Sequence, residues 1–218
     1  MLNPSEVMES ISVQLNHKLI PDQIQRLQKQ IEFMLEIDKL KHILRKTILT
    51  DRSREENSVE HSWHIAMAAF LFSEYAQDQE IDLYRVMKML LVHDLVEIDA
   101  GDTYCYDYQS QQDQASREQK AAERIFKILP PDQSRSFRAL WDEFESRDTP
   151  ESKYANALDR FQPFLQNYFT KGQIWRENNI TRRQVIDRMH PVLDGAPLLW
   201  NLVKLLIDDA VQKKYLAG

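Results

Sequence analysis

A histidine and an aspartate stand next to each other inside an apolar run. His93 and Asp94 interrupt residues 86–98, where most other side chains are aliphatic or methionine. An unpaired carboxylate buried there would cost several kcal/mol, so something must compensate Asp94. A divalent metal ion does this well, because imidazole and carboxylate groups are its common ligands. From this dipeptide alone, a buried arginine or the end of a neighbouring helix is an equally good partner.

Two further residues could join this pair. His61 begins an apolar stretch 32 residues before His93, and two antiparallel helices would bring them together. Taken alone, His61 is more typical of a structural histidine than of a ligand. Asp159 has small and apolar neighbours, which indicates that its carboxylate also points inward. Pro163 removes the amide that would bond to the Asp159 carbonyl, which predicts a helix kink beside this carboxylate.

Together these residues resemble the ligand pattern of the HD-domain superfamily, which runs His, then His-Asp, then a distant Asp. The pattern falls on Glu60-His61-Ser62, His93-Asp94 and Asp159. Residues 93–102, HDLVEIDAGD, are similar to the HDxxE...GD signature of the branch that contains bacterial 5'-deoxynucleotidases and their eukaryotic relatives. The similarity covers residues 31–168. It implies an all-α fold, an HD-domain helical bundle with a buried metal site between central helices.

The resemblance also implies a site for phosphate-ester hydrolysis. One divalent metal ion, with Mn, Co, Mg, Fe, Ni and Zn as candidates, would be held by His61, His93, Asp94 and Asp159. Such an ion polarises a phosphoryl oxygen and activates water for attack. The two carboxylate ligands would balance its charge.

Two acidic residues near these ligands are the catalytic candidates. Glu97 is four residues after His93, so it is expected to share that helix face and could orient the water or move its proton. Asp102 follows a helix end at Gly101 and, by the resemblance, is the second acid/base candidate, for the leaving 5'-oxygen. The alternatives are a surface salt bridge for Glu97 and a loop cap for Asp102.

Basic and aromatic side chains are expected to contact the substrate. By the resemblance, Arg45 holds the substrate phosphate, because a planar guanidinium can bind two phosphate oxygens. Lys46, Arg52 or Arg54 could serve instead, and the alternative for Arg45 is an exposed cation at a helix end. Trp63 could wall the substrate pocket, although a buried aromatic residue needs no such role.

These features predict a metal-dependent hydrolase that removes phosphate from (deoxy)ribonucleoside 5'-monophosphates. Family analogy selects the monophosphate, and a cyclic nucleotide, a triphosphate or an alarmone is an alternative substrate. A nucleotide-binding helical protein without turnover is a further alternative, against which Glu97 and Asp102 argue. Binding to nucleic acid or to an anionic membrane is disfavoured, because the formal net charge is -6 and the basic clusters are short.

Helices must position these residues. Only four glycines occur in 218 residues, which leaves few tight turns and favours helices joined by polar loops. Ser58 and Thr149 are the expected N-caps of two of these helices. The apolar pattern predicts helices over residues 6–15, 23–40, 59–76, 83–98, 115–129, 133–145, 150–169, 182–189 and 198–215.

Polar loops are expected at 47–57 and 102–114. In the second loop, Tyr104, Tyr106 and Tyr108 could stack on a base or form part of a polar lid. No repeat or linker occurs, so residues 1–218 are assigned to a single HD-type domain with the C-terminal helices packed on it.

The remaining features concern location and assembly. One cysteine, Cys105, and the absence of an exported leader favour a soluble protein of the reducing cytoplasm. No apolar stretch approaches the ~20 residues needed to span a bilayer. The last helix carries more apolar residues than one face can bury, which predicts a homodimer.

Overall fold

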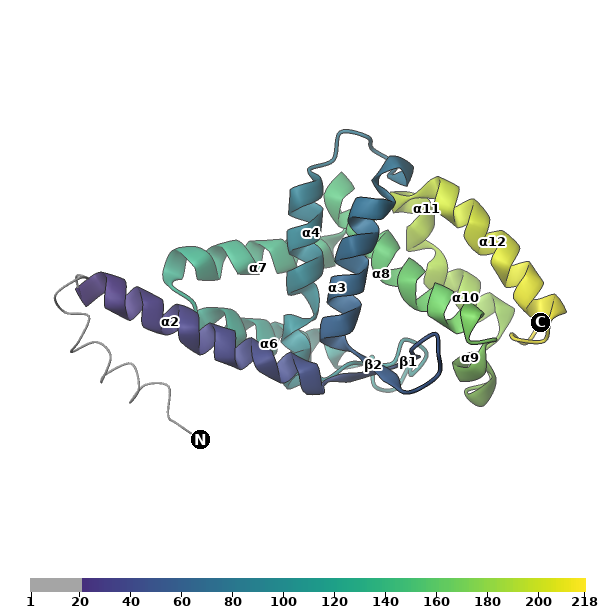
Figure 1. Cartoon of the computed structure of the whole chain (residues 1–218), viewed down its shortest axis with the longest axis horizontal. Coiled ribbons are helices and arrows are strands. Elements are labelled where there is room, and N and C mark those ends of the chain that lie inside the picture. Colours follow the sequence, from purple (N-terminus) through teal and green to yellow (C-terminus); the bar gives the residue numbers. More distant parts are fainter. Residues whose placement is uncertain (1–20) are drawn as a thin grey trace.

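The computed structural model describes residues 21–218 as a bundle of helices with one small β-hairpin (Figure 1). The helical elements, in which η marks a 3-10 helix, are α2 (Pro21–Ile37), η1 (Asp38–His42), α3 (Ser58–Leu71), η2 (Ser73–Tyr75), α4 (Leu83–Val92), η3 (His93–Val96), α5 (Glu97–Ala100), α6 (Gln114–Lys127), α7 (Pro131–Ser146), α8 (Pro150–Phe169), α9 (Gln173–Glu177), α10 (Arg182–Met189), α11 (Pro191–Gly195) and α12 (Pro197–Gln212). The predicted all-α bundle is confirmed, whereas the helix predicted at 6–15 lies outside the described residues.

Helix α8 is the central element of the core. It packs against α3, α4, α7 and α11, and α3 and α4 run side by side next to it (Figure 1). Its start agrees with the sequence prediction, because the Thr149 side chain accepts a hydrogen bond from the Ser152 amide at 3.1 Å and Pro150 occupies the first turn. An element with neighbours on so many sides holds its inward-facing side chains in fixed positions.

Helix α3 begins one residue earlier than predicted. Asn57, not Ser58, is its N-cap: the Asn57 side chain accepts from the Glu60 amide at 3.0 Å. The Glu60 carboxylate accepts in return from the Asn57 amide at 3.1 Å, which completes a capping box. Ser58 is therefore the first helical residue, and its hydroxyl is available to another element.

The helix predicted over residues 83–98 changes form at the predicted metal ligands. Helix α4 ends at Val92 and the tighter η3 follows. Helix α5 ends at Ala100, and its C-cap Gly101 has a φ of 74°, which glycine adopts readily. In a 3-10 turn residues three apart share a face, so Glu97 is aligned with Asp94. His93 and Glu97 nevertheless both line the same cavity, which is described below.

The predicted loop at 47–57 is instead largely a β-hairpin. Strands β1 (Leu44–Ile48) and β2 (Glu55–Asn57) are antiparallel, with Leu44 opposite Asn57 and Ile48 opposite Glu55. The exposed residues 50–54 lie at its tip. Arg45 therefore belongs to a strand, and the alternative interpretation of Arg45 as an exposed cation at a helix end is wrong.

Two short helices, α9 and α11, were not predicted from the sequence. Each has five residues, which is too short for apolar periodicity to show. Helix α11 nevertheless makes an extensive contact with α8.

Replacing Gly195 by alanine should destabilise the packing of α11 on α8. A Cβ atom at Gly195 would lie 2.3 Å from the Lys153 carbonyl oxygen and 2.9 Å from the Ala157 Cβ. The helices would have to separate, which we expect to lower the free energy of unfolding by about 1–3 kcal/mol. Urea unfolding measures this change. Gly218→Ala is the control, because its added methyl group would meet Val211 at 3.7 Å, and equal stabilities would contradict the prediction.

No helix within residues 21–218 is long and apolar enough to cross a membrane. A hydrophobic cluster extends from Phe33 of α2 to Leu216 beyond α12. The assignments to one domain and to the cytoplasm stay predictions.

Candidate active site

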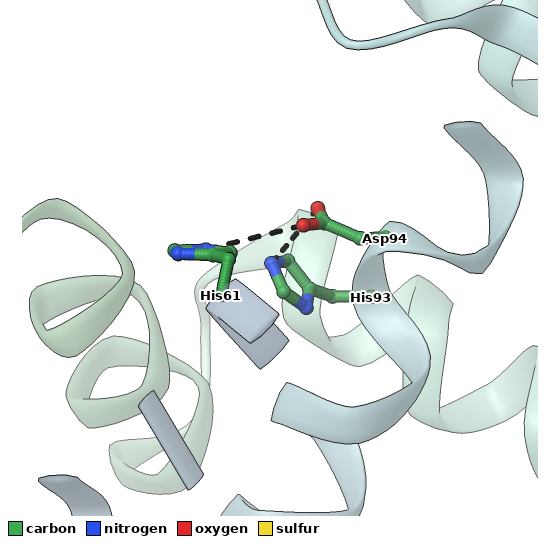
Figure 2. Close-up of side chains that lie close together, drawn as sticks. All are labelled: His61, His93 and Asp94. Atoms are coloured by element: carbon green, nitrogen blue, oxygen red, sulfur yellow. Dashed lines mark ion pairs between the residues drawn. The ribbon is translucent and has the colours of Figure 1, made fainter. Parts of the chain in front are cut away.

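Three elements bring the predicted metal ligands to one place. His61 lies in the first turns of α3, His93 and Asp94 begin η3, and Asp159 lies midway along α8. His61, His93 and Asp94 are buried, and each offers a ligand atom within 4.8 Å of the others (Figure 2). Asp159 Oδ1 is 3.0 Å from His61 Nε2 and 3.7 Å from His93 Nε2. All four side chains therefore converge.

Hydrogen bonds determine which imidazole nitrogen faces this centre. His93 Nδ1 donates to the Leu90 carbonyl oxygen at 2.9 Å. His61 Nδ1 donates to Gln162 Oε1 at 2.9 Å, and the Gln162 amide is oriented by its own donation to Glu56 at 3.0 Å. A carbonyl oxygen only accepts, so each Nδ1 carries a hydrogen, and in the neutral form of the ring each Nε2 would present a lone pair. Such support is usual for metal-binding histidines.

The two Nε2 atoms face carboxylate oxygens, an arrangement that requires a cation. His93 Nε2 lies 2.9 Å from Asp94 Oδ1, yet it has no hydrogen-bond partner among the described residues. Burial lowers the pKa of His93, but the charges of Asp94 and Asp159 outweigh it and raise that pKa well above its usual value. Positive charge is thus favoured here, whether a proton or a metal supplies it. Two imidazoles and two carboxylates fit a divalent ion.

Both carboxylates are held in the ionised form that a metal ligand needs. Burial opposes ionisation of Asp94, but the charges of His93 and Arg45 prevail and lower its pKa to about 2. Burial likewise opposes ionisation of Asp159, yet its pKa is well below the usual value, chiefly because of Arg160. Arg160 forms an ion pair with Asp159 Oδ2.

Arg45 joins the predicted metal ligands to the predicted acid/base residues. Its Nη1 lies 2.9 Å from Asp94 Oδ2, 3.8 Å from Glu97 Oε1 and 3.7 Å from Asp102 Oδ1. Its buried Nε has no hydrogen-bond partner within residues 21–218, so one donor is unused. A guanidinium among carboxylates can hold a phosphate that would otherwise be repelled.

Glu97 and Asp102 hold protons more strongly than ordinary carboxyl groups. Burial, then repulsion by Asp94, raises the pKa of Glu97 well above its usual value, and the Ser58 hydroxyl donates to Glu97 at 2.6 Å. Burial also raises the pKa of Asp102, although Arg45 opposes this. Glu97 is only 7% exposed, which excludes the surface salt bridge. Buried carboxyl groups with raised pKa values suit proton transfer.

A cavity of about 560 Å³ lies beside these groups, within the usual size range of small-molecule sites. The lining includes the side chains of Arg45, Asp94, Glu97, Asp102 and Asp159. Tyr104, Tyr106 and Tyr108 of the loop after α5 also line it, so this loop covers one side of the cavity.

Trp63 does not line this cavity. Its side chain is 62% exposed, whereas His61 on the same helix is fully buried. Residues two apart are rotated by about 200° around a helix, so the two side chains point in nearly opposite directions. The structure therefore gives no support to Trp63 as a wall of the substrate pocket.

Two buried residues that support the site were not predicted. Gln162 follows Asp159 by three residues on α8, and this helical spacing could have shown that they share a face. Glu56 is 1% exposed and accepts hydrogen bonds from Gln162 and Gln166. No signal indicated Glu56, because its segment has the composition of a polar loop.

Replacing Gln162 by leucine should weaken metal binding. The change removes the acceptor that orients His61, and loss of such a partner typically lowers metal affinity by about 10–100-fold. Competition with a fluorescent chelator measures the affinity. Gln166→Leu is the matched control, because Gln166 also donates to Glu56, at 2.7 Å, but forms no hydrogen bond with His61 among the described residues. Equal losses would assign the effect to Glu56 and contradict the prediction.

Comparisons with known proteins agree with this geometry. The family model described as HD domain matches residues 37–200. The chain belongs to the HD domain family. This HD domain chain is also similar to the crystal structure of a predicted metal-dependent phosphohydrolase from Magnetospirillum magnetotacticum, with 48% sequence identity and a TM-score of 0.87. The match covers 92% of this chain and 100% of that one.

Curated relatives of the HD domain chain include 5'-deoxynucleotidases. The Homo sapiens 5'-deoxynucleotidase HDDC2 is 26% identical over 137 residues, which are 62% of this chain and 65% of that protein. The Danio rerio 5'-deoxynucleotidase HDDC2 is 28% identical over 141 residues, which are 64% of this chain and 68% of that protein. The chain thus matches about 65% of the length of the human protein. The resemblance to the HD-domain superfamily is confirmed.

Proposed function

We propose that this chain is a metal-dependent phosphohydrolase that removes phosphate from (deoxy)ribonucleoside 5'-monophosphates. The observation that carries the proposal is the convergence of His61, His93, Asp94 and Asp159 beside Arg45 in one cavity. The fully matched Magnetospirillum magnetotacticum relative, a predicted metal-dependent phosphohydrolase, supports the reaction class.

The residues have distinct roles in the proposed reaction. A divalent ion held by the four ligands would polarise a phosphoryl oxygen and lower the pKa of water. Arg45 would bind phosphate oxygens through its guanidinium and neutralise part of their charge. Glu97 and Asp102, whose raised pKa values favour the protonated form, would move protons between water and the leaving 5'-oxygen.

The substrate class is supported by the relatives and by the cavity. The matched proteins of Homo sapiens, Danio rerio and Schizosaccharomyces pombe are 5'-deoxynucleotidases. A cavity of about 560 Å³ is large enough for a small-molecule ligand. Its tyrosines offer aromatic faces on which a base could stack.

Phosphate release from a panel of ribo- and deoxyribonucleoside 5'-monophosphates tests the proposal. The assay is run with Mn, Co and Mg, and wild type is compared with Asp94→Ala and Glu97→Ala. We expect release that depends on metal and is lost in both variants. Absence of release from every monophosphate would refute the proposed activity, and cyclic nucleotides and triphosphates would then be tested.

An exposed apolar stripe on α12 supports the prediction of a homodimer. This helix buries Leu199, Val203 and Ile207, yet leaves Leu198 and Leu205 exposed together with Leu202. We propose that a second copy of the chain covers this apolar stripe. Light scattering should give twice the chain mass for wild type and a lower mass for Leu205→Glu. A monomeric mass for wild type would refute the dimer.

A further inference from the structure

A basic side chain from α10, outside the predicted site, reaches the cavity. Arg188 lines the cavity, whereas Val185 and Met189 of the same helix are buried. Helix α10 packs against α8, which carries Asp159. Arg188 is close enough to this carboxylate, and to Arg160 beside it, for both charges to act on its guanidinium. Arg188 thus borders the same space as the predicted metal ligands.

Arg188 differs from the arginines already placed in the site. Arg45 pairs with Asp94, and Arg160 pairs with Asp159. By contrast, no hydrogen bond or ion pair joins the Arg188 guanidinium to another residue within 21–218. Its five N–H donors are therefore unused by the protein.

The surroundings of Arg188 favour an anion. Burial, and then repulsion by Arg160, lower the pKa of Arg188 from its usual value, although a guanidinium still remains charged at neutral pH. A partly buried cation beside a second cation is unfavourable unless negative charge joins it. A guanidinium presents paired donors that match the oxygens of a phosphate group.

We propose that Arg188, with Arg160 beside it, binds a phosphate group of the nucleotide that enters the cavity. This inference rests on the proposed function, because it concerns a ligand of the same site. The group is the phosphate that is hydrolysed, or a neighbouring phosphate if the ligand carries linked phosphates as a nucleoside triphosphate does, and both offer the same oxygen acceptors. Arg188 then acts as a substrate-binding residue and does not hold the metal.

Calorimetric titration separates these two sources without requiring turnover. Inorganic phosphate stands for the hydrolysed group, and methylenebisphosphonate, which cannot be hydrolysed between its phosphorus atoms, stands for linked phosphates. Both are titrated into magnesium-loaded wild type, Arg188→Gln, Arg188→Lys and Arg183→Gln. Arg183 is the matched control, because it lies on α10, its side chain is 91% exposed and it does not line the cavity.

We expect Arg188→Gln to weaken binding by about 10–100-fold, as for loss of a charged hydrogen bond, with partial recovery in Arg188→Lys and no change in Arg183→Gln. Weaker binding of both probes assigns Arg188 to the hydrolysed phosphate. Weaker binding of the bisphosphonate alone assigns it to a second phosphate. Unchanged binding of both probes overturns the inference.

Further measurements distinguish this role from a structural one. Arg188→Gln should lower neither the metal content nor the melting temperature relative to wild type, since a fall in either would indicate damage to the fold. A binding residue is expected to hold the phosphate equally in the ground state and in the transition state. If wild type hydrolyses monophosphates, Arg188→Gln should therefore raise KM more than it lowers kcat. Absence of phosphate release from wild type would refute the proposed function, while the calorimetric result would still decide the role of Arg188.

Discussion

Asp94→Asn should lower phosphate release by roughly 10³-fold or more, because a bound metal contributes several kcal/mol of transition-state stabilisation. We expect the predicted metal centre to depend strongly on Asp94. It lies next to His93 and bonds to Arg45, and its pKa of about 2 keeps it negative at all pH values of interest. An asparagine has a similar shape but no charge, so both the metal ion and the Arg45 guanidinium would lose the carboxylate that neutralises them.

Two measurements check this expectation. Metal content per chain, determined by inductively coupled plasma mass spectrometry, should fall together with activity. Asp99→Asn is the control, because Asp99 is an exposed acidic residue of α5 that pairs with Arg124. Retention of full metal content and activity by Asp94→Asn would show that the ion binds elsewhere.

Glu97→Gln should lower kcat by about 10²–10⁴-fold while metal content stays unchanged. Glu97 is buried, accepts a hydrogen bond from Ser58 and lies near Arg45, yet it is not one of the four predicted metal ligands. Glutamine keeps the size and the hydrogen bond but cannot transfer a proton. The effect should therefore fall on the chemical step.

The control for Glu97→Gln is another carboxyl group of the cavity. Burial raises the pKa of Glu118, which lines the cavity and accepts a hydrogen bond from Gln114. Glu118→Gln should keep kcat within about threefold of wild type if proton transfer belongs to Glu97. Similar losses in both variants would argue for a general effect of cavity charge instead. Loss of metal from Glu97→Gln would make Glu97 a ligand.

Three of the four predicted metal ligands could be proposed from the sequence because each has an unusual setting. His93 and Asp94 are polar residues in an apolar run, and Asp159 stands among small residues, so burial of all three could be expected. Periodicity also placed α8 correctly, because Thr149 and Pro150 mark its start. The sequence around His61 has no such unusual feature, so the assignment of His61 as a ligand depended on the resemblance.

The local secondary structure around these residues could not be predicted from the periodicity of apolar residues. The change from α4 to η3 leaves apolar residues on every side, so an α-helix and a 3-10 turn give the same pattern. Strand β2 has only three residues, two of them glutamates, and its one buried residue, Glu56, is contacted by Gln162 and Gln166 of the distant helix α8. Arg188 lies beyond residues 31–168, and only the packing of α10 on α8 brings it to the cavity.

The hairpin has a consequence for how relatives of this chain should be aligned. Strand β2 runs directly into α3, so Arg45 and His61 are held by opposite ends of one short structural unit. The exposed tip at residues 50–54 can gain or lose residues without moving either end. We therefore expect insertions and deletions to accumulate at this tip during evolution. The number of residues between the arginine and the first histidine is then a poor guide to homology, and alignments should be anchored on the strands.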